Sequence, residues 1–162
     1  MNLVGTTSLT SWERAADSEE SWPRQVATGL PNGRDFLALN AACRPTGGLA
    51  RGDDLARLLA DHRFGDFVSL AGLIDSGEIF GFEWRHYFWI PMFQFELRDL
   101  SSKPGARQVR EELAPAFDGW PLATWFGDPN AWLSARRPVD LLDSDLPAVL
   151  DAARADRFIA AG

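Results

Sequence analysis

Apolar side chains recur at helical spacing in the stretch that begins near residue 53. Leu55, Leu58 and Leu59 share one face, and two aspartates precede them where a carboxylate can cap a helix. The pattern stops after His62. It therefore predicts a helix over residues 53–62.

A second helical pattern follows directly. Asp66 is its candidate N-cap, and Gly77 is placed to end it in the left-handed conformation. Between them, four apolar residues have the i, i+3, i+4, i+7 spacing of a single buried face: Phe67, Leu70, Ala71 and Ile74. The sequence therefore predicts two short consecutive helices.

The period then changes, and the new pattern predicts a β-hairpin. Residues 79–84 alternate between apolar and other positions, and residues 87–95 are almost wholly apolar and aromatic. Arg85 and His86 separate the two runs, and neither favours the positive φ of a two-residue turn, so we expect a wider loop or a bulge. Pro91 cannot donate a ladder hydrogen bond, so we expect its strand to lie at an edge there.

Helical spacing resumes after a polar linker at residues 101–105, in Ala106, Val109, Leu113 and Phe117. Four prolines then mark candidate helix starts: Pro121, Pro129, Pro138 and Pro147. The last helix is expected over about residues 147–158, with Val149, Leu150 and Ala153 directed inward. This density of starts indicates short helices packed at angles.

These elements predict a mainly α protein with one β-hairpin, an α+β fold. Residues 1–48 carry many turn signals and are expected to be poorly organised. The apolar run at residues 36–39 could be a buried turn or a strand, and the sequence does not decide between them. Residues 49–100 form a helix–helix–hairpin region, winged-helix-like or serving dimerisation. Residues 105–162 form a helical C-terminal domain.

Composition and charge narrow the class of protein. The chain has 162 residues, 46% of them hydrophobic, and a formal net charge of -7. Its single cysteine, Cys43, cannot form an internal disulfide, which favours a reducing cytoplasm. No run approaches the ~20 apolar residues of a membrane span, and the first residues lack the pattern of a secretory signal. We therefore expect a cytoplasmic protein without membrane contact, whose acidic surface can steer a basic partner.

The motifs of common enzymes are absent from the sequence. His62, His86 and Cys43 lie far apart, without zinc-ligand spacing. Neither a phosphate-binding G-x-x-x-x-G-K, nor a dinucleotide G-x-G-x-x-G, nor a G-x-S-x-G elbow occurs. The adjacent acidic pairs fit helix caps and solvated faces. We expect no catalytic residue, no cofactor and no metal.

Two helices followed by a hairpin also give the order of elements of a winged-helix module. The helix expected to read bases, residues 66–75, contains no Arg, Lys, Asn or Gln, the side chains that base-edge contacts need. Four arginines are candidates for contacts with DNA phosphates: Arg51, Arg57, Arg63 and Arg85. A DNA-binding autoregulator is thus the alternative function, and the aromatic hairpin suits a core or dimer contact better than base stacking.

The second half carries a more specific pattern. Residues 117–126 read FDGWPLATWF, and residues 129–142 read PNAWLSARRPVDLL. This stretch resembles the C-terminal toxin-binding domain of the Xre/MbcA/ParS antitoxins, where a W-x-L-A-x-W-like helix precedes P-N-x-x-L-x-G-x-x-P-x-D-L-L and a final helix. The resemblance covers about residues 105–162. Residues 88–95, FWIPMFQF, are similar to the strand that precedes this domain in many such antitoxins.

The resemblance implies a type II antitoxin that inhibits its toxin by direct binding. The usual partner is a RES-type toxin that degrades NAD+, and the C-terminal helix and tail of such antitoxins lie at the toxin's active-site cleft. A homodimer within a hetero-oligomer is the implied assembly. Carried over to this chain, the toxin-binding residues are Trp132, Arg136, Arg137, Arg154, Asp156, Arg157, Phe158 and Ile159.

Several of these residues also have purely structural interpretations. Arg154 and Arg157 would favour the negative end of a helix dipole. Trp132 can pack internally, and Arg136 and Arg137 can belong to a solvated turn. The sequence leaves these alternatives open.

The chain departs from the family pattern at two places. Ser134 and Ala135 replace glycines that precede the basic pair, so a positive φ at this turn would strain Ala135. The first half lacks the basic recognition helix of Xre repressors.

Overall fold

The computed structural model describes residues 31–62 and 69–162 of the chain. The candidate phosphate contact Arg63 and the predicted cap Asp66 lie outside these ranges, as does most of the segment 1–48.

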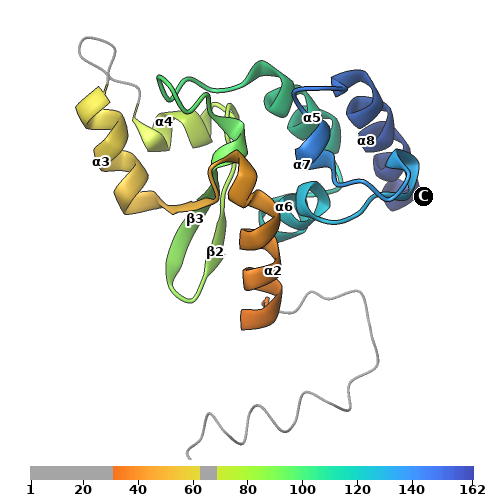
Figure 1. Cartoon of the computed structure of the whole chain (residues 1–162), viewed down its shortest axis with the longest axis horizontal. Helices are drawn as coiled ribbons and strands as arrows, with labels where there is room; N and C mark the ends of the chain where they lie inside the picture. The colour runs from red at the N-terminus through yellow and green to blue at the C-terminus, as the bar shows by residue number, and fades with distance from the viewer. Residues whose placement is uncertain (1–30, 63–68) are drawn as a thin grey trace, which may run out of the picture. The chain divides into compact units, whose positions relative to one another are not determined.

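The described part is mainly helical, with one small antiparallel sheet (Figure 1). Its elements, in chain order, are α2 (Gly33–Cys43), η2 (Arg44–Thr46), β1 (Leu49–Arg51), α3 (Gly52–His62), α4 (Leu70–Asp75), β2 (Phe82–Trp84), β3 (Tyr87–Pro91), η3 (Met92–Gln94), α5 (Pro104–Leu113), α6 (Gly119–Gly127), η4 (Ala131–Leu133), α7 (Pro138–Leu141) and α8 (Leu146–Ala161). The predicted fold class, α+β with helices predominating, is confirmed.

Helix α2 lies inside the segment that the sequence predicts to be poorly organised. A capping box begins it: Asn32 Oδ1 accepts from the backbone N–H of Asp35 at 2.9 Å, and Asp35 Oδ2 accepts from the backbone N–H of Asn32 at 3.3 Å. Phe36 and Leu39 are buried. The apolar run is therefore one face of a helix, neither the turn nor the strand considered from sequence, and the prediction of poor organisation is wrong for residues 33–43.

Helix α3 lies where periodicity predicts it, whereas α4 begins at Leu70 and buries Leu73 in place of the predicted Ala71, which is exposed. Leu55 and Leu59 are buried, whereas Leu58 is 42% exposed although the sequence placed it on the same face. Ser69 caps α4, since its hydroxyl accepts a hydrogen bond from a first-turn backbone N–H at 3.0 Å. Gly77 has a φ of 73°, which confirms it as the left-handed terminator.

Strand β3 is the central strand of the sheet, whose order is β1-β3-β2 with both pairs antiparallel. The strand that residues 49–51 form was not predicted, and it makes β3 central over part of its length, but the predicted edge position at Pro91 is confirmed. The β2 ladder ends at the pair Phe82–Trp89, so Pro91 lies beyond it and pairs with Leu49 of β1. The proline thus occupies the part of β3 that has a neighbour on one side.

The hairpin turn has two residues, and the predicted wider loop or bulge is wrong. Trp84 pairs with Tyr87, and both residues between them have positive φ, 47° at Arg85 and 67° at His86. Two left-handed residues match the twist of paired strands, which is why this geometry dominates short hairpins even without asparagine or glycine. The Arg85 guanidinium lies 4.6 Å from the centroid of the Trp84 ring. This cation–π contact helps to offset the backbone strain.

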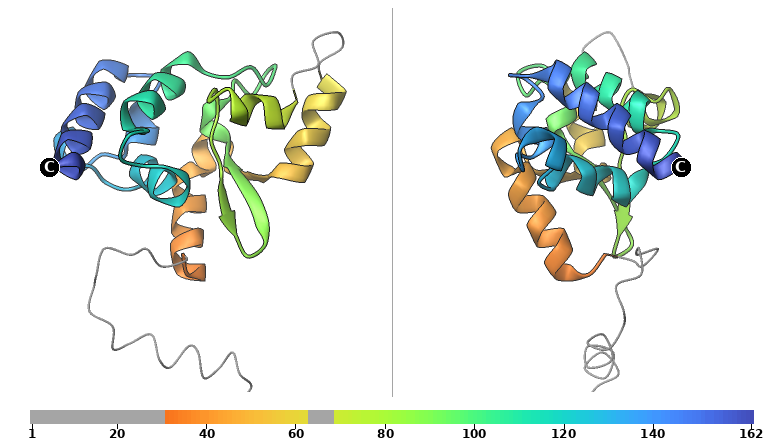
Figure 2. Two further views of the ribbon diagram at one scale, coloured as in Figure 1. Left: turned by 180° about the vertical axis from the view of Figure 1, so that it is seen from behind. Right: turned by 90° about the vertical axis from the view of Figure 1, so that its right-hand side faces the viewer.

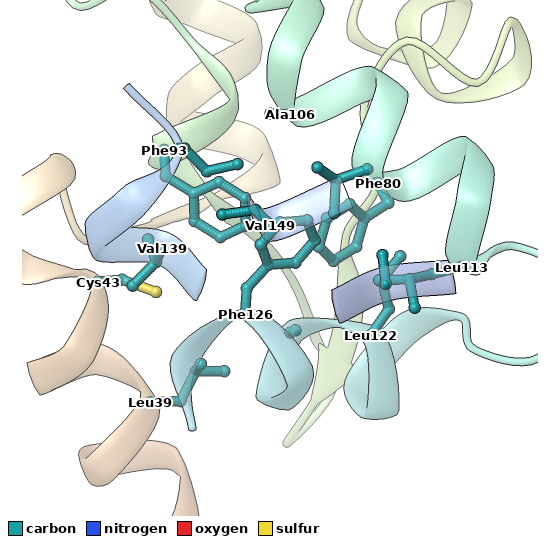
Figure 3. Close-up of a cluster of buried hydrophobic side chains, with 14 of the residues drawn as sticks. Leu39, Cys43, Phe80, Phe93, Ala106, Leu113, Leu122, Phe126, Val139 and Val149 are labelled. Atoms are coloured by element: carbon teal, nitrogen blue, oxygen red, sulfur yellow. The ribbon is translucent and has the colours of Figure 1, made fainter. Parts of the chain in front are cut away.

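Helices α3 and α4 lie on one side of the sheet and the C-terminal helices on the other (Figure 2), and the buried side chains form two hydrophobic clusters. The larger one joins α2, the hairpin and helices α5 to α8 around Phe126, whose ring centroid is 4.6 Å from that of Phe93 and 6.0 Å from that of Phe80 (Figure 3). The smaller one packs α3 and α4 against β3 through residues such as Leu55 and Ile90. The hairpin and the C-terminal helices therefore share one core, and residues from Pro31 onward form one compact unit.

The C-terminal helices follow the predicted spacing. Ala106, Val109 and Leu113 of α5 are buried, and Val149 and Ala153 of α8 pack in the same cluster. Helices α5 and α8 lie side by side (Figure 1). Three of the four prolines lie in the first turns of α6, α7 and α8. The other, at position 129, precedes the η4 turn, which a neighbouring asparagine caps.

Gln94 joins the two runs of the hairpin inside the core. Its side chain is 3% exposed. The amide oxygen accepts from the backbone N–H of Phe80 at 2.8 Å, and the amide nitrogen donates to the carbonyls of Phe80 at 2.8 Å and Pro91 at 3.0 Å. These bonds continue the contact between the two segments beyond the β2–β3 ladder.

We expect Gln94→Leu to lower the free energy of unfolding by about 3 kcal/mol, since three buried backbone groups lose their partner. Urea unfolding measures the change. Gln108→Leu on the exposed side of α5 is the control and should stay within about 0.5 kcal/mol of the parent. Equal effects of the two substitutions would contradict the role given to Gln94.

Candidate functional site

The carboxylate of Asp156 joins three segments of the C-terminal half. Its Oδ2 accepts hydrogen bonds from the Trp125 indole at 2.8 Å and from the Asn130 amide at 2.7 Å, and its Oδ1 accepts from the Trp132 indole at 2.9 Å. We call Asp156 and these three donors the Asp156 hub. Bonds to a charged acceptor are stronger than neutral ones. The hub therefore fixes α8 against α6 and η4.

Asn130 organises the chain between α6 and α7. It is 8% exposed, and besides its bond to Asp156 its Oδ1 accepts from the backbone N–H of Trp132 at 2.9 Å. Its own backbone N–H donates to the carbonyl of Arg136, and its carbonyl accepts from Ala135, both at 3.0 Å. These bonds close a tight loop that presents Trp132 at its tip.

The loop needs two consecutive residues in the left-handed region. Ser134 has a φ of 56° and Ala135 a φ of 63°. These are the positions where glycines are replaced in the pattern described above. The expected positive φ is thus present, and the two side chains carry a backbone strain that glycine would avoid.

Glu112 of α5 holds the other side of α8. Its carboxylate pairs with Arg154 Nε at 3.1 Å and with Arg157 Nη1 at 2.8 Å. Arg154 also pairs with Asp151, at 3.0 Å. Neither arginine relies on the helix dipole alone, which was the structural alternative for both. Half of the Arg154 side chain remains exposed.

The last turns of α8 expose apolar side chains. Phe158 is 81% exposed and Ile159 65%, and the nearby Trp132 of η4 is 59% exposed. Ile159 follows Asp156 by three residues, so it lies one turn further along the side that faces Trp132. We call Trp132, Phe158 and Ile159 together the apolar face, of which Phe158, four residues after Arg154, lies on the side of α8 that carries Arg154. Exposed apolar side chains that gather on one surface mark a candidate interaction site.

The remaining predicted toxin contacts fall into two groups. Arg136 and Arg137 belong to the loop after η4, where Arg136 Nε donates to the carbonyl of Leu133 at 3.1 Å and Arg137 pairs with Asp140 at 2.8 Å. Asp156 accepts the three hydrogen bonds of the hub, one of them from Trp132. Arg136, Arg137 and Asp156 therefore form one group at the loop after η4, whereas Arg154 and Arg157 form the other, on the side of α8 that faces α5.

The candidate DNA contacts Arg51, Arg57 and Arg85 have partners within the protein. Arg51 lies 3.9 Å from the centroid of the Tyr87 ring and 3.6 Å from Asp53, and Arg57 contacts Asp54 at 3.5 Å. Arg85 stacks on the hairpin tryptophan as described. The short α4 has no side chain in Leu70–Asp75 suited to base edges.

Sequence reasoning missed Glu112 and Trp125 as parts of the site. Glu112 meets arginines more than forty positions away, so local spacing gives no signal for it. Trp125 lies in the quoted W-x-L-A-x-W pattern, and its indole donor needs an acceptor when half-buried. That need signals an acceptor near Trp125, but it does not identify Asp156 as that acceptor.

Three observations on the described residues concern metal-ligand clusters, membrane-spanning helices and a titratable group with a shifted pKa. Within residues 31–62 and 69–162 no group of three or more His, Cys, Asp or Glu could hold a metal ion. No helix of the same ranges has the length and apolar character that a membrane crossing requires. Burial raises the pKa of the Cys43 thiol to about 12, with a smaller opposing effect from Arg137, so Cys43 stays protonated near neutral pH.

Comparison of the chain with protein-family models, with curated proteins and with solved structures finds no match.

We expect Asp156→Asn to lower the free energy of unfolding by about 2 kcal/mol. Asparagine lacks the negative charge, and its NH2 group cannot accept the hydrogen bonds that the side chains of Trp125, Asn130 and Trp132 donate. The indole N–H signals of Trp125 and Trp132 should shift in NMR spectra. Asp151→Asn removes a charge from the exposed side of the same helix and should cost less than about 1 kcal/mol. Equal losses, with unshifted indole signals, would refute the hub.

Ala135→Gly should raise the free energy of unfolding by about 1 kcal/mol, because glycine adopts the observed φ without strain. Thermal or urea unfolding gives the value. Ala56→Gly on the exposed side of α3 is the matched control, and it should lower stability by about 1 kcal/mol. A loss of stability at both positions would show that the loop is not strained.

Proposed function

We propose that this protein is an antitoxin that neutralises a RES-type, NAD+-degrading toxin in the cytoplasm by direct binding, without catalysis. The observation that carries the proposal is the apolar face, where Phe158 is 81% and Ile159 65% exposed at the end of α8. Aromatic and arginine side chains are the usual anchors of tight interfaces. A projecting helix end that carries them is suited to entering a cleft.

The rigidity of the helix supports the proposal. Asp156 holds one side of α8, and Glu112 holds the other through Arg154 and Arg157. Because α8 is already helical to Ala161, binding needs little ordering of its backbone, and little entropy is lost. An inhibitor that acts by occlusion benefits from such pre-organisation.

The resemblance of residues 105–162 to Xre/MbcA/ParS antitoxins supports the choice of partner. In that family the final helix occludes the toxin's active-site cleft. Arg154 keeps half of its side chain exposed, so its guanidinium can reach the place of an anionic pyrophosphate. The homodimer within a hetero-oligomer belongs to the same proposal.

A DNA-binding autoregulator has less support. Its candidate arginines at 51, 57 and 85 are occupied by acidic or aromatic neighbours, and α4 has no side chain suited to reading bases. Sequence-selective binding of the isolated protein to its own promoter, falling steeply with salt, would favour this alternative.

We expect Phe158→Asp and Ile159→Asp each to weaken the complex with the RES-type protein encoded beside it at least tenfold, about 1.4 kcal/mol. A carboxylate cannot be buried in an apolar cleft without loss. Affinity by calorimetry, growth rescue and cellular NAD+ content in co-expressing cells are the measurements.

Leu97→Asp is the matched control, because Leu97 is 57% exposed and lies in the loop between η3 and α5. It should leave affinity and rescue unchanged. Full rescue by both tail variants, or equal loss with the control, would contradict binding through the end of α8.

A further inference from the structure

A pocket of about 380 Å³ opens between α6, the loop that follows it and α8. Phe117 and Trp125 give it aromatic walls, and Asp128, Asn130 and Asp156 give it oxygen acceptors. Its volume lies near the lower end of the roughly 300–1,000 Å³ of small-molecule sites. The pocket therefore suits one side chain or one small ligand.

The charge of the pocket is unbalanced. None of its lining residues is Lys, Arg or His. The three donors of the hub are neutral, so they leave the full negative charge on Asp156. Within the described part of the chain, the side chain of Asp128 forms no ion pair or hydrogen bond. Burial raises the pKa of Asp128, and the nearby carboxylate of Asp35 raises it further.

We infer that this pocket binds the guanidinium group of an arginine side chain. Two carboxylates and two aromatic side chains line the same pocket, a combination suited to ion pairing and cation–π attraction for a planar cation. A guanidinium stacks on an aromatic face and is less strongly hydrated than an ammonium, so arginine is favoured over lysine.

The occupant is an arginine of the protein partner. Trp125 of the pocket and Trp132 of the apolar face share the carboxylate of Asp156, so pocket and face are contiguous. The chain's net charge of -7 complements a basic partner. The identity of the partner rests on the proposed function, whereas the affinity for guanidinium does not.

The first experiment titrates the full chain with N-acetyl-arginine amide and follows the indole N–H signals of Trp125 and Trp132 by NMR. We expect saturable shifts with a millimolar dissociation constant. The neutral isostere N-acetyl-citrulline amide should give none, and N-acetyl-lysine amide, acetylated only at its α-amino group, should bind several-fold more weakly. Absent shifts, equal shifts with citrulline, or lysine binding as tightly would overturn the inference.

Asp128→Asn should weaken binding of the arginine probe at least fivefold. Asp75→Asn, at the exposed end of α4, changes the net charge equally and should leave the affinity unchanged. Equal losses in the two variants would mean attraction by overall charge and would overturn the site.

The second experiment measures the affinity of the same two variants for the RES-type partner. A fivefold or greater loss confined to Asp128→Asn supports an arginine of the partner as the occupant. An unchanged complex, with probe binding intact, overturns that occupant and identifies a free guanidinium compound as the ligand. If the chain binds the RES-type partner but not the arginine probe, the inferred guanidinium site is overturned and the proposed function is unaffected.

Discussion

One carboxylate on α8 fixes the arrangement on which the candidate site depends. Asp156 accepts three hydrogen bonds from side chains of α6 and of the η4 loop. Asn130 is buried, so removing the Asp156 carboxylate would leave its side-chain amide without this hydrogen-bond acceptor and away from water. The orientation of Trp132, the closure of the η4 loop and the wall of the pocket all depend on this group.

The hub has its effect because α8 is also held elsewhere. Glu112 pairs with two arginines on the side toward α5. Val149 packs in the core around Phe126 (Figure 3), and Ala153 belongs to the same cluster. The helix is thus fixed along its length, and apolar side chains appear only where these contacts end. An inhibitor that acts by occlusion needs this combination of a firmly packed helix and an exposed apolar end.

The sequence predicted those elements in which a single apolar face repeats. The α3, α5 and α8 helices follow from leucine, valine and alanine spacing. Helix α2 was missed although the pair Asn32 and Asp35 has capping-box spacing, because its apolar run is short. Strand β1 has three residues and no alternation, so only its pairing with β3 reveals it. The two-residue turn at Arg85 was missed because strand twist outweighed residue preference.

The site was predicted in part. The resemblance implied Phe158 and Ile159 as partner contacts, and the structure places both, exposed, in the last turns of α8. Asp156 was taken as a partner contact, whereas the structure gives it three internal donors, and Glu112 was not considered at all. Both partnerships join residues far apart in the chain, and a single sequence carries no signal of which distant charge or donor a side chain meets.

Hydrogen exchange measured on the free protein and on its complex with the RES-type toxin proposed above as the partner tests the central claim most directly. Binding through the end of α8 predicts slowed exchange in residues 128–137 and 154–162, with residues 82–90 of the hairpin unchanged. Slowed exchange confined to the hairpin, with both C-terminal segments unchanged, would contradict it.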